Sequence, residues 1–388
     1  SSLKQIQTIG INAYAGPTSD RGFAQSTQKA DKIKNATSLV YAGDATGAQE
    51  RYYGASMNNP NNQLPIYTPM VWRDNRVSFY PHHGKNMNFL MLGANVKSYT
   101  DSQMRTICAT VPSVAATAGP GLIVCLTIGL NVGKAIAGFS GKPFVAVNHL
   151  EGHALSPALS NKIKFPYLLL LISGGHSQYL IVKNVNDYKQ IGTTIDDALG
   201  EAFDKTAKML NLGYPGGPAV EKFAKQGDKN FYKLPEPIIN KAGCNLSFAG
   251  LKTAVLIQSK KIKDNKKLKL NLASSFQETI IKILNKKTKI AFSEFKKFSK
   301  KENNVFVVAG GVAANKSIRK SLEELSKKNN FKPIFSDFKF CGDNAAMIGW
   351  AGIQRYKRKL INDLNVEPKS RWPLDKAAPY MKGPGLKL

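Results

Sequence analysis

The chain is poor in cysteine, in histidine and in acidic residues. Its 388 residues include 4 cysteines and 5 histidines, and 26 Asp and Glu stand against 55 Lys and Arg. The cysteines form no Cys-x-x-Cys pair, which argues against a disulfide framework or a zinc ribbon and favours a reducing, cytoplasmic location. The first residues also lack the positive, apolar and small-residue pattern of a secretory signal. The four cysteines are Cys108, Cys125, Cys244 and Cys341.

Long uninterrupted apolar runs are absent as well. The longest apolar region, residues 121–139, is interrupted by Asn131 and Lys134. We therefore expect a core element there and no membrane span, which needs about 18 or more apolar residues in a row. The apolar fraction of 43% fits a globular enzyme, and the length allows two domains or one large two-lobed domain.

The shortage of acidic residues leaves a formal net charge of +29. Such an excess indicates a polyanionic partner, because lysines that neutralise phosphates release bound counterions. Solvated lysine faces and a genome-wide bias toward lysine explain the same charge, so the charge alone leaves nucleic-acid binding open. The lysine runs lie at residues 260–263, 286–289 and 296–301.

Two of the few histidines, His149 and His153, stand four residues apart. At this spacing both side chains lie on one face of a helix and can offer two nitrogen ligands to one metal ion. Glu151 lies roughly 200° from His149 around such a helix. Zinc proteases place the glutamate directly after the first histidine, so the pattern disfavours a metalloprotease. A single histidine would more often be structural, but the pairing predicts a metal site.

Two glycine pairs follow short apolar runs. Residues 167–172 predict a buried strand that enters a turn at Gly174-Gly175, and residues 305–308 predict another that enters Gly310-Gly311. Such turns expose backbone N–H groups as phosphate-binding turns do. One pair is explained equally well by tight packing, whereas two at strand ends favour a nucleotide site.

The motifs together resemble the bacterial TsaD family, the tRNA N6-adenosine threonylcarbamoyltransferases once described as O-sialoglycoprotein endopeptidases. The resemblance runs in order from about residue 117 to 378. The motifs that carry it are TAGPGL at 117–122, NHLEGH at 148–153, LISGGH at 171–176, GEAFDKTAK at 200–208, YPGGP at 214–218, SFAGLKTA at 247–254, AGGVAAN at 309–315, CGDNAAM at 341–347 and RWPLD at 371–375.

The resemblance implies an α/β protein with the actin-like ATPase (ASKHA) fold, in which two α/β lobes flank a nucleotide and metal cleft. We expect a first lobe at residues 1–158, a second lobe at 159–365 and an extended tail at 366–388. The family pattern implies one divalent ion per subunit, iron(II) or zinc, held by His149, His153 and Asp343. Taken alone, Asp343 would be expected to cap a helix.

The same resemblance implies the substrate site and the reaction. The threonylcarbamoyl group passes from threonylcarbamoyl-AMP to N6 of adenosine 37 in tRNAs that read codons beginning with A. Partners implied by the family are a paralogous TsaB-like subunit and a TsaE-like small ATPase, with no membrane. Glu201 and His176 are candidate general bases. The implied substrate-binding residues are Ile172, Ser173, Gly174, Gly175, His176, Asp204, Gly217, Glu221 and Asn315.

Residues 1–116 do not match the family pattern. Members begin with a strand and a phosphate loop that contains acidic and hydroxyl residues, and here only Ile9-Gly10-Ile11 is similar. Divergence, replacement by an unrelated segment and an error in the sequence all explain the mismatch. It leaves two alternatives to the transferase, a non-catalytic or impaired scaffold and an ATP-dependent kinase of the same fold, although a histidine metal pair is not part of the kinase pattern.

Overall fold

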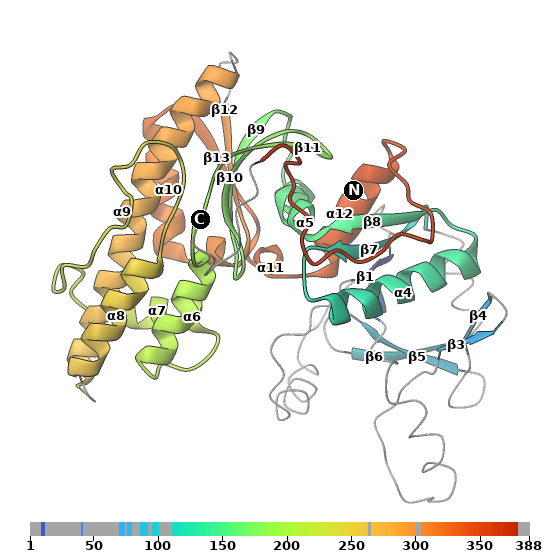
Figure 1. Cartoon of the computed structure of the whole chain (residues 1–388), viewed down its shortest axis with the longest axis horizontal. Coiled ribbons are helices and arrows are strands. Elements are labelled where there is room, and N and C mark those ends of the chain that lie inside the picture. Colours follow the sequence, from blue (N-terminus) through green and yellow to red (C-terminus); the bar gives the residue numbers. More distant parts are fainter. Residues whose placement is uncertain are drawn as a thin grey trace, which may run out of the picture. The chain divides into compact units, whose positions relative to one another are not determined.

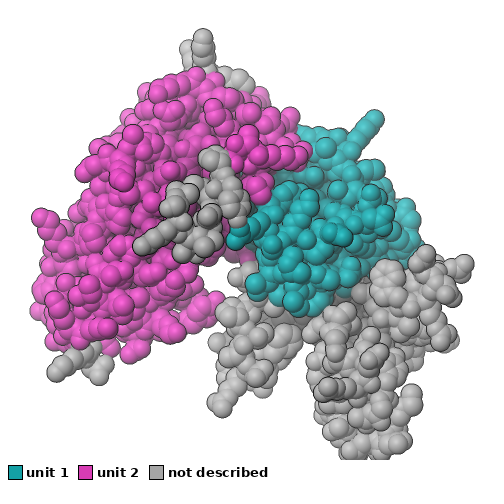
Figure 2. All heavy atoms as spheres, viewed as in Figure 1, with its two compact units in different colours: residues 1–155, 344–372 teal, residues 156–343, 373–388 magenta. Residues whose placement is uncertain are grey.

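The computed structural model describes residues 9–11, 40–41, 70–73, 76–79, 86–91, 95–100, 111–262, 265–299 and 304–378. Two compact units make up the chain, coloured separately in Figure 2. Unit 1 consists of Ser1–Leu155 and Asn344–Trp372, and unit 2 of Ser156–Asp343 and Pro373–Leu388. The chain thus leaves unit 1 after Leu155 and returns to it at Asn344.

Unit 1 is built on a parallel sheet of order β1-β7-β8, formed by β1 (Ile9–Ile11), β7 (Val114–Gly119) and β8 (Phe144–Asn148). Both β7 and β8 are buried along their whole length, as expected for strands in a parallel sheet that is covered on both faces. The strand β1 is the segment in which the sequence is similar to the family's first strand. It pairs in parallel with β7.

Three helices complete the described core of unit 1: α4 (Ile123–Ser140), α5 (His149–Leu155) and α12 (Ala345–Tyr356). Both α4 and α12 pack on the sheet, and α12 also packs on α5 (Figure 1). Antiparallel strands form a second sheet of order β2-β5-β6 and a β3–β4 pair. Their bounds are Val40–Tyr41 (β2), Met70–Arg73 (β3), Arg76–Phe79 (β4), Asn86–Met91 (β5) and Asn95–Thr100 (β6).

The helix α4 covers the apolar region in which the sequence predicts a core element. Within the described part of the chain it is the one helix that is long and apolar enough to cross a membrane, with a mean hydropathy of 1.6. Its contacts with β7 and β8 are those of a core helix. Length and composition alone do not separate these two roles, whereas the packing on the sheet favours the core.

Unit 2 contains a five-stranded sheet of order β11-β10-β9-β12-β13. The strands β9, β12 and β13 run parallel, and β10 is antiparallel to both of its neighbours. Leu168, Leu170 and Ile172 of β9 belong to the main hydrophobic core, while the alternate residues are buried on the other face. The strand bounds are Tyr167–Ile172 (β9), Ser177–Asn184 (β10), Asp187–Thr193 (β11), Asn304–Ala309 (β12) and Phe331–Phe335 (β13).

Helices gather on one side of this sheet, where the long helix α9 (Lys266–Phe298) is prominent (Figure 1). Phe276, Ile280 and Ile283 of α9 are fully buried in the core against the sheet. The fully buried hydroxyl of Tyr179 in β10 pairs with Thr288 of α9 at 2.8 Å, and burial raises the pKa of this phenol. The remaining bounds are Ser156–Leu159 (η3), Leu199–Met209 (α6), Gly216–Ala224 (α7), Ala249–Ile262 (α8), Gly311–Ala314 (η4), Lys316–Lys328 (α10) and Phe338–Cys341 (α11).

The unit boundaries and the lobes expected from the sequence differ in two respects. The first division, after Leu155, falls three residues before the expected position at 158. Residues 344–365, expected in the second lobe, are grouped with unit 1 because α12 packs on α5, β7 and β8. The tail expected to be extended contains no helix up to residue 378.

Candidate functional site

The helix that carries the two histidines begins at a well-defined point. The Asn148 side chain accepts hydrogen bonds from the backbone N–H groups of Leu150 at 2.9 Å and Glu151 at 3.4 Å. Asn148 therefore caps the helix, and its amide also donates to the Trp372 carbonyl at 2.8 Å. His149 and His153 lie one turn apart, with ring centroids 4.9 Å apart and ring planes perpendicular. The two imidazoles are thus neighbours on one face of the helix, as the four-residue spacing predicts.

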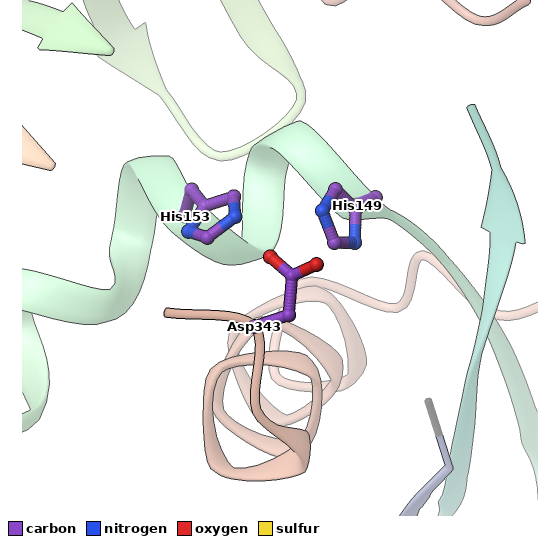
Figure 3. Close-up of side chains that lie close together, drawn as sticks. All are labelled: His149, His153 and Asp343. Atoms are coloured by element: carbon purple, nitrogen blue, oxygen red, sulfur yellow. The ribbon is translucent and has the colours of Figure 1, made fainter. Parts of the chain in front are cut away.

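Asp343 lies directly before Asn344, which caps α12 and accepts a hydrogen bond from the Met347 N–H at 2.8 Å. Capping is thus performed by Asn344, and the Asp343 carboxylate points toward the two imidazoles (Figure 3). The ligand atoms of His149, His153 and Asp343 all lie within 4.8 Å of one another. A close approach of α12 to α5 accompanies this arrangement: a methyl group on Gly152 would lie 2.9 Å from Ile348 Cδ1.

These three residues fit a divalent metal ion. The donors are two imidazole nitrogens and one carboxylate oxygen, a set that both iron(II) and zinc accept. His153 is buried, His149 is half-buried and Asp343 is exposed. An ion in this position would be anchored in the protein and would keep coordination positions for a substrate, as sites with three protein ligands do.

Glu151 takes no part in this cluster. Its carboxylate accepts a hydrogen bond from Arg355 Nη1 of α12 at 2.7 Å, and only 1% of the Glu151 side chain is exposed. The sequence interpretation that Glu151 faces away from the histidine pair agrees with this position. A buried carboxylate paired with a guanidinium stabilises the packing of α5 on α12 and does not activate a water molecule at the histidines.

The two glycine turns that the sequence singles out lie next to each other in unit 2. Both follow parallel strands, β9 and β12, that are neighbours in the sheet. Gly310 has φ +94°, and a methyl group on it would lie 2.4 Å from the Ile172 carbonyl oxygen. Gly200 of α6 packs as closely against the first turn and donates its N–H to the Ser173 carbonyl at 3.1 Å. Only glycine permits these contacts.

Other glycines of these turns border open space. A methyl group on Gly174, Gly175 or Gly311 would meet no atom of the described residues within 4 Å. The first turn is held from within, because the Ser173 N–H donates to the His176 carbonyl at 2.8 Å and the His176 N–H to Ser173 Oγ at 3.2 Å. The turns therefore present an open edge of backbone at the carboxyl ends of β9 and β12, where ligands bind in α/β sheets.

Asp204 supports the neighbouring turn that begins α7. Its carboxylate accepts the Gly216 N–H at 3.0 Å. Partial desolvation raises the pKa of Asp204, although the N–H groups of Gly216 and Gly217 act in the opposite direction. Gly217 itself borders open space. Asp204 thus stabilises the backbone that carries Gly217, a role that adds to the substrate contact expected from the sequence.

Asn315 and Glu221 both act at the N-terminus of α10. The Asn315 side chain accepts the Ile318 N–H at 3.0 Å and donates to Gln277 Oε1 at 2.8 Å. Glu221 Oε1 accepts the Lys316 N–H at 2.9 Å. Asn315 therefore caps α10. Gln277, which orients the Asn315 amide from α9, was not predicted, because no local pattern links residues so far apart in the chain.

The candidate bases differ in their surroundings. Glu201 is paired with Lys205 at 2.5 Å, and Lys205 also lies 3.6 Å from Asp197. The carboxylate of Asp197 pairs in addition with Lys252 of the SFAGLKTA motif. His176 is half-buried, and its backbone closes the first glycine turn. The ion-pair network around Asp197 joins two motifs and has no spacing signature in the sequence.

Comparison with known proteins identifies the family. The family model described as "TsaD: tRNA N6-adenosine threonylcarbamoyltransferase" matches residues 102–350. The chain belongs to this family. A relative with that name from Pelagibacter ubique is 59% identical over 276 residues, which cover 71% of this chain and 77% of the relative. A Rickettsia rickettsii relative is 46% identical over 275 residues (70% and 80%), and one from Rhizobium etli is 48% identical over 281 residues (71% and 77%).

Several sequence predictions are thereby confirmed. The family, the actin-like α/β fold class and the class of enzyme, a transferase that modifies tRNA, agree with the comparisons. The match begins at residue 102, not 117, so most of the segment that does not fit the family pattern lies outside it. The donor cluster makes a bound metal plausible without identifying the ion.

Proposed function

We propose that this protein transfers the threonylcarbamoyl group of threonylcarbamoyl-AMP to N6 of adenosine 37 in tRNAs that read codons beginning with A. The observation that carries the proposal is the convergence of His149, His153 and Asp343, whose ligand atoms lie within 4.8 Å of one another. This cluster accompanies the two glycine turns in a chain of the transferase family. A scaffold subunit would have no need of a complete ligand set.

The reaction is an acyl transfer in which AMP is the leaving group. A divalent ion held by His149, His153 and Asp343 would supply a Lewis acid that binds and polarises the adenylate. The protein's own contribution is to hold the two substrates in the reactive orientation, which accounts for a large part of the barrier in such reactions. Buried His153 and the capped start of α5 keep this ligand set rigid.

The glycine turns are proposed to receive the phosphate and nucleoside parts of the adenylate. The turn from Ile172 to His176 offers unobstructed backbone to the phosphate region, because a methyl group on Gly174 or Gly175 would meet no atom of the described residues within 4 Å. Asp204, Gly217, Glu221 and Asn315 then contact the sugar and base. Asn315 and Glu221 would make this contact in addition to their hydrogen bonds to backbone N–H groups at the start of α10. Those hydrogen bonds hold the two side chains in place.

Glu201 and His176 remain the proposed candidates for accepting the proton of the attacking amine. Lys205 holds the Glu201 carboxylate in one position through their ion pair. His176 belongs to the turn proposed to hold the adenylate. The proposal includes a TsaB-like subunit and a TsaE-like ATPase as partners, and a cytoplasmic location.

Replacement of Asp343 tests the proposal. The variant Asp343→Asn should lose most of the bound metal and most of the transfer activity, because an amide is a far weaker ligand than a carboxylate. The fold should persist, since Asn344 and not Asp343 caps α12. The measurements are metal content by mass spectrometry of the purified protein and threonylcarbamoyladenosine in digested tRNA after incubation with threonylcarbamoyl-AMP and the partner proteins.

The matched control is Asp363→Asn, which changes an exposed aspartate whose carboxylate accepts the nearby Asn365 N–H at 2.8 Å. It should leave metal content and product unchanged. Full activity of Asp343→Asn without bound metal would overturn the metal-centred mechanism. A folded, metal-loaded wild-type protein that forms no product would favour the scaffold alternative.

A further inference from the structure

Arg319 is placed where two parts of the candidate site meet in unit 2. It lies one turn into α10, and its backbone N–H donates to the carbonyl of Asn315, the residue that caps this helix. Its guanidinium reaches back to the second glycine turn, where Nε donates to the Ala313 carbonyl at 3.1 Å. Ala313 belongs to η4, which follows Gly310 directly.

The same guanidinium holds the segment that leads to Asp343. Its Nη2 donates to the Ser336 carbonyl at 2.8 Å and lies 3.5 Å from Cys341 Sγ. Cys341 precedes Asp343 by two residues, and its buried thiol also donates to the Ser336 carbonyl at 3.5 Å. Arg319 thus cross-links the start of this segment to its end, and both to η4.

Two aromatic rings fix the plane of the guanidinium. Arg319 Cζ lies 4.8 Å from the ring centroid of Phe335 and 4.3 Å from that of Phe338. Stacking on ring faces and a fork of several N–H donors are properties of arginine that lysine does not share. Phe338 is 56% exposed, so burial in the hydrophobic core does not explain why its ring lies against Arg319.

We propose that Arg319 is a positioning residue that couples the adenylate-binding turn at residues 310–315 to the metal ligand Asp343. This inference rests on the proposed function and extends it to Arg319, which is neither a metal ligand nor one of the proposed substrate-binding residues. One rigid planar cation sets the position of both segments. A change at Arg319 should therefore weaken metal binding and adenylate binding together.

The test compares Arg319→Lys and Arg319→Gln with wild type. The first variant keeps the cation but loses the fork of donors, and the second loses the charge as well. The affinity for Zn(II) is measured by competition with a chromophoric chelator, and KM and kcat are measured separately for threonylcarbamoyl-AMP. Removal of groups that orient a metal ligand commonly weakens metal affinity about 10- to 100-fold, and we expect Arg319→Lys to fall in this range with a raised KM.

The control is Arg358→Lys, which changes an exposed arginine whose side chain bonds to Gln354 within its own segment. It should keep Zn(II) affinity and KM at wild-type values. If Arg319→Gln fails to fold, Arg319→Lys still carries the test. A native-like Arg319→Lys protein with a lower melting temperature but unchanged Zn(II) affinity and KM would show a merely structural role and overturn the inference.

Failure of this inference is distinguishable from failure of the proposed function. If wild type binds Zn(II) and transfers the group while Arg319→Lys equals it in both measurements, only the role of Arg319 is wrong. If wild type binds no Zn(II) at the histidines, so that His149→Ala has the same affinity, the metal-centred function is wrong and the coupling with it.

Discussion

At the scale of single residues, the buried pair of Glu151 and Arg355 separates this protein from a metalloprotease. Their side chains are 1% and 9% exposed and lie 2.7 Å apart. Replacing Glu151 by Ala leaves the Arg355 charge buried beside a cavity, which costs about 3–5 kcal/mol of unfolding free energy. We expect a corresponding decrease for Glu151→Ala in urea denaturation followed by tryptophan fluorescence, because Trp72, Trp350 and Trp372 all belong to unit 1.

The double variant Glu151→Ala/Arg355→Met should recover much of that loss, since no buried charge is then left without its opposite. Glu367→Ala, at an exposed position of unit 1, serves as the control and should change stability by less than about 0.5 kcal/mol. A loss in Glu151→Ala no greater than in this control would contradict the structural role assigned to the pair.

The residues that could be predicted are those whose chemistry shows in local spacing. His149 and His153 are four residues apart on one helix, so a short stretch of sequence suffices. Asp343 needed the family pattern, because its proximity to the histidines depends on the packing of α12 against α5. Arg355 and Arg319 were not predicted, since each acts on residues that the chain brings together only after folding.

At the scale of elements, the second glycine turn makes different demands at its two adjacent glycines. Gly310 combines a positive φ with a close contact to the Ile172 carbonyl, whereas Gly311 borders open space. Gly310→Ala should therefore destabilise the protein by about 1–3 kcal/mol, the usual cost of a strained backbone conformation, and separate β9 from β12. Thermal unfolding followed by circular dichroism measures this loss.

Gly311→Ala is the matched variant, because its methyl group would meet no atom within 4 Å in the part of the chain that the structure describes. Its stability should stay within about 0.5 kcal/mol of wild type. If the adenylate lies against this turn as proposed, the methyl group should raise KM for threonylcarbamoyl-AMP about ten-fold, which corresponds to about 1.4 kcal/mol. An unchanged KM would place the adenylate elsewhere.

Strands and helices with a clear apolar pattern were predicted closely. The expected strand at residues 167–172 is β9 itself, and the expected strand at 305–308 lies within β12. The helix α8 was not predicted, because its apolar residues do not share one face: Val255 is buried, whereas Leu256 and Ile257 are exposed. The helix α9 begins at Lys266, where Asn265 caps a lysine-rich first turn that lacks an apolar pattern.

At the scale of the whole molecule, the formal net charge of +29 is not explained by the metal ligands or the glycine turns. A tRNA substrate accounts for it, since family membership implies a polyanionic substrate. The exposed lysines that contribute include Lys260, Lys282, Lys286 and Lys289 on α8 and α9. Charge alone could not distinguish this role from a solvated surface, whereas the dependence of binding on salt does so directly.

The affinity for tRNA should fall steeply with salt concentration. Each phosphate that a lysine neutralises contributes a slope of about −0.7 to −0.9 to log K against log salt, so six or more contacts lose on the order of 10³-fold in affinity between about 50 and about 200 mM. Fluorescence anisotropy of labelled, unmodified tRNA measures this slope. The KM for threonylcarbamoyl-AMP, a small substrate with a single phosphate group, should change far less over the same range. An equal, shallow response of both substrates would mean that the lysines serve solubility and that tRNA is bound mainly by contacts from the partner subunits.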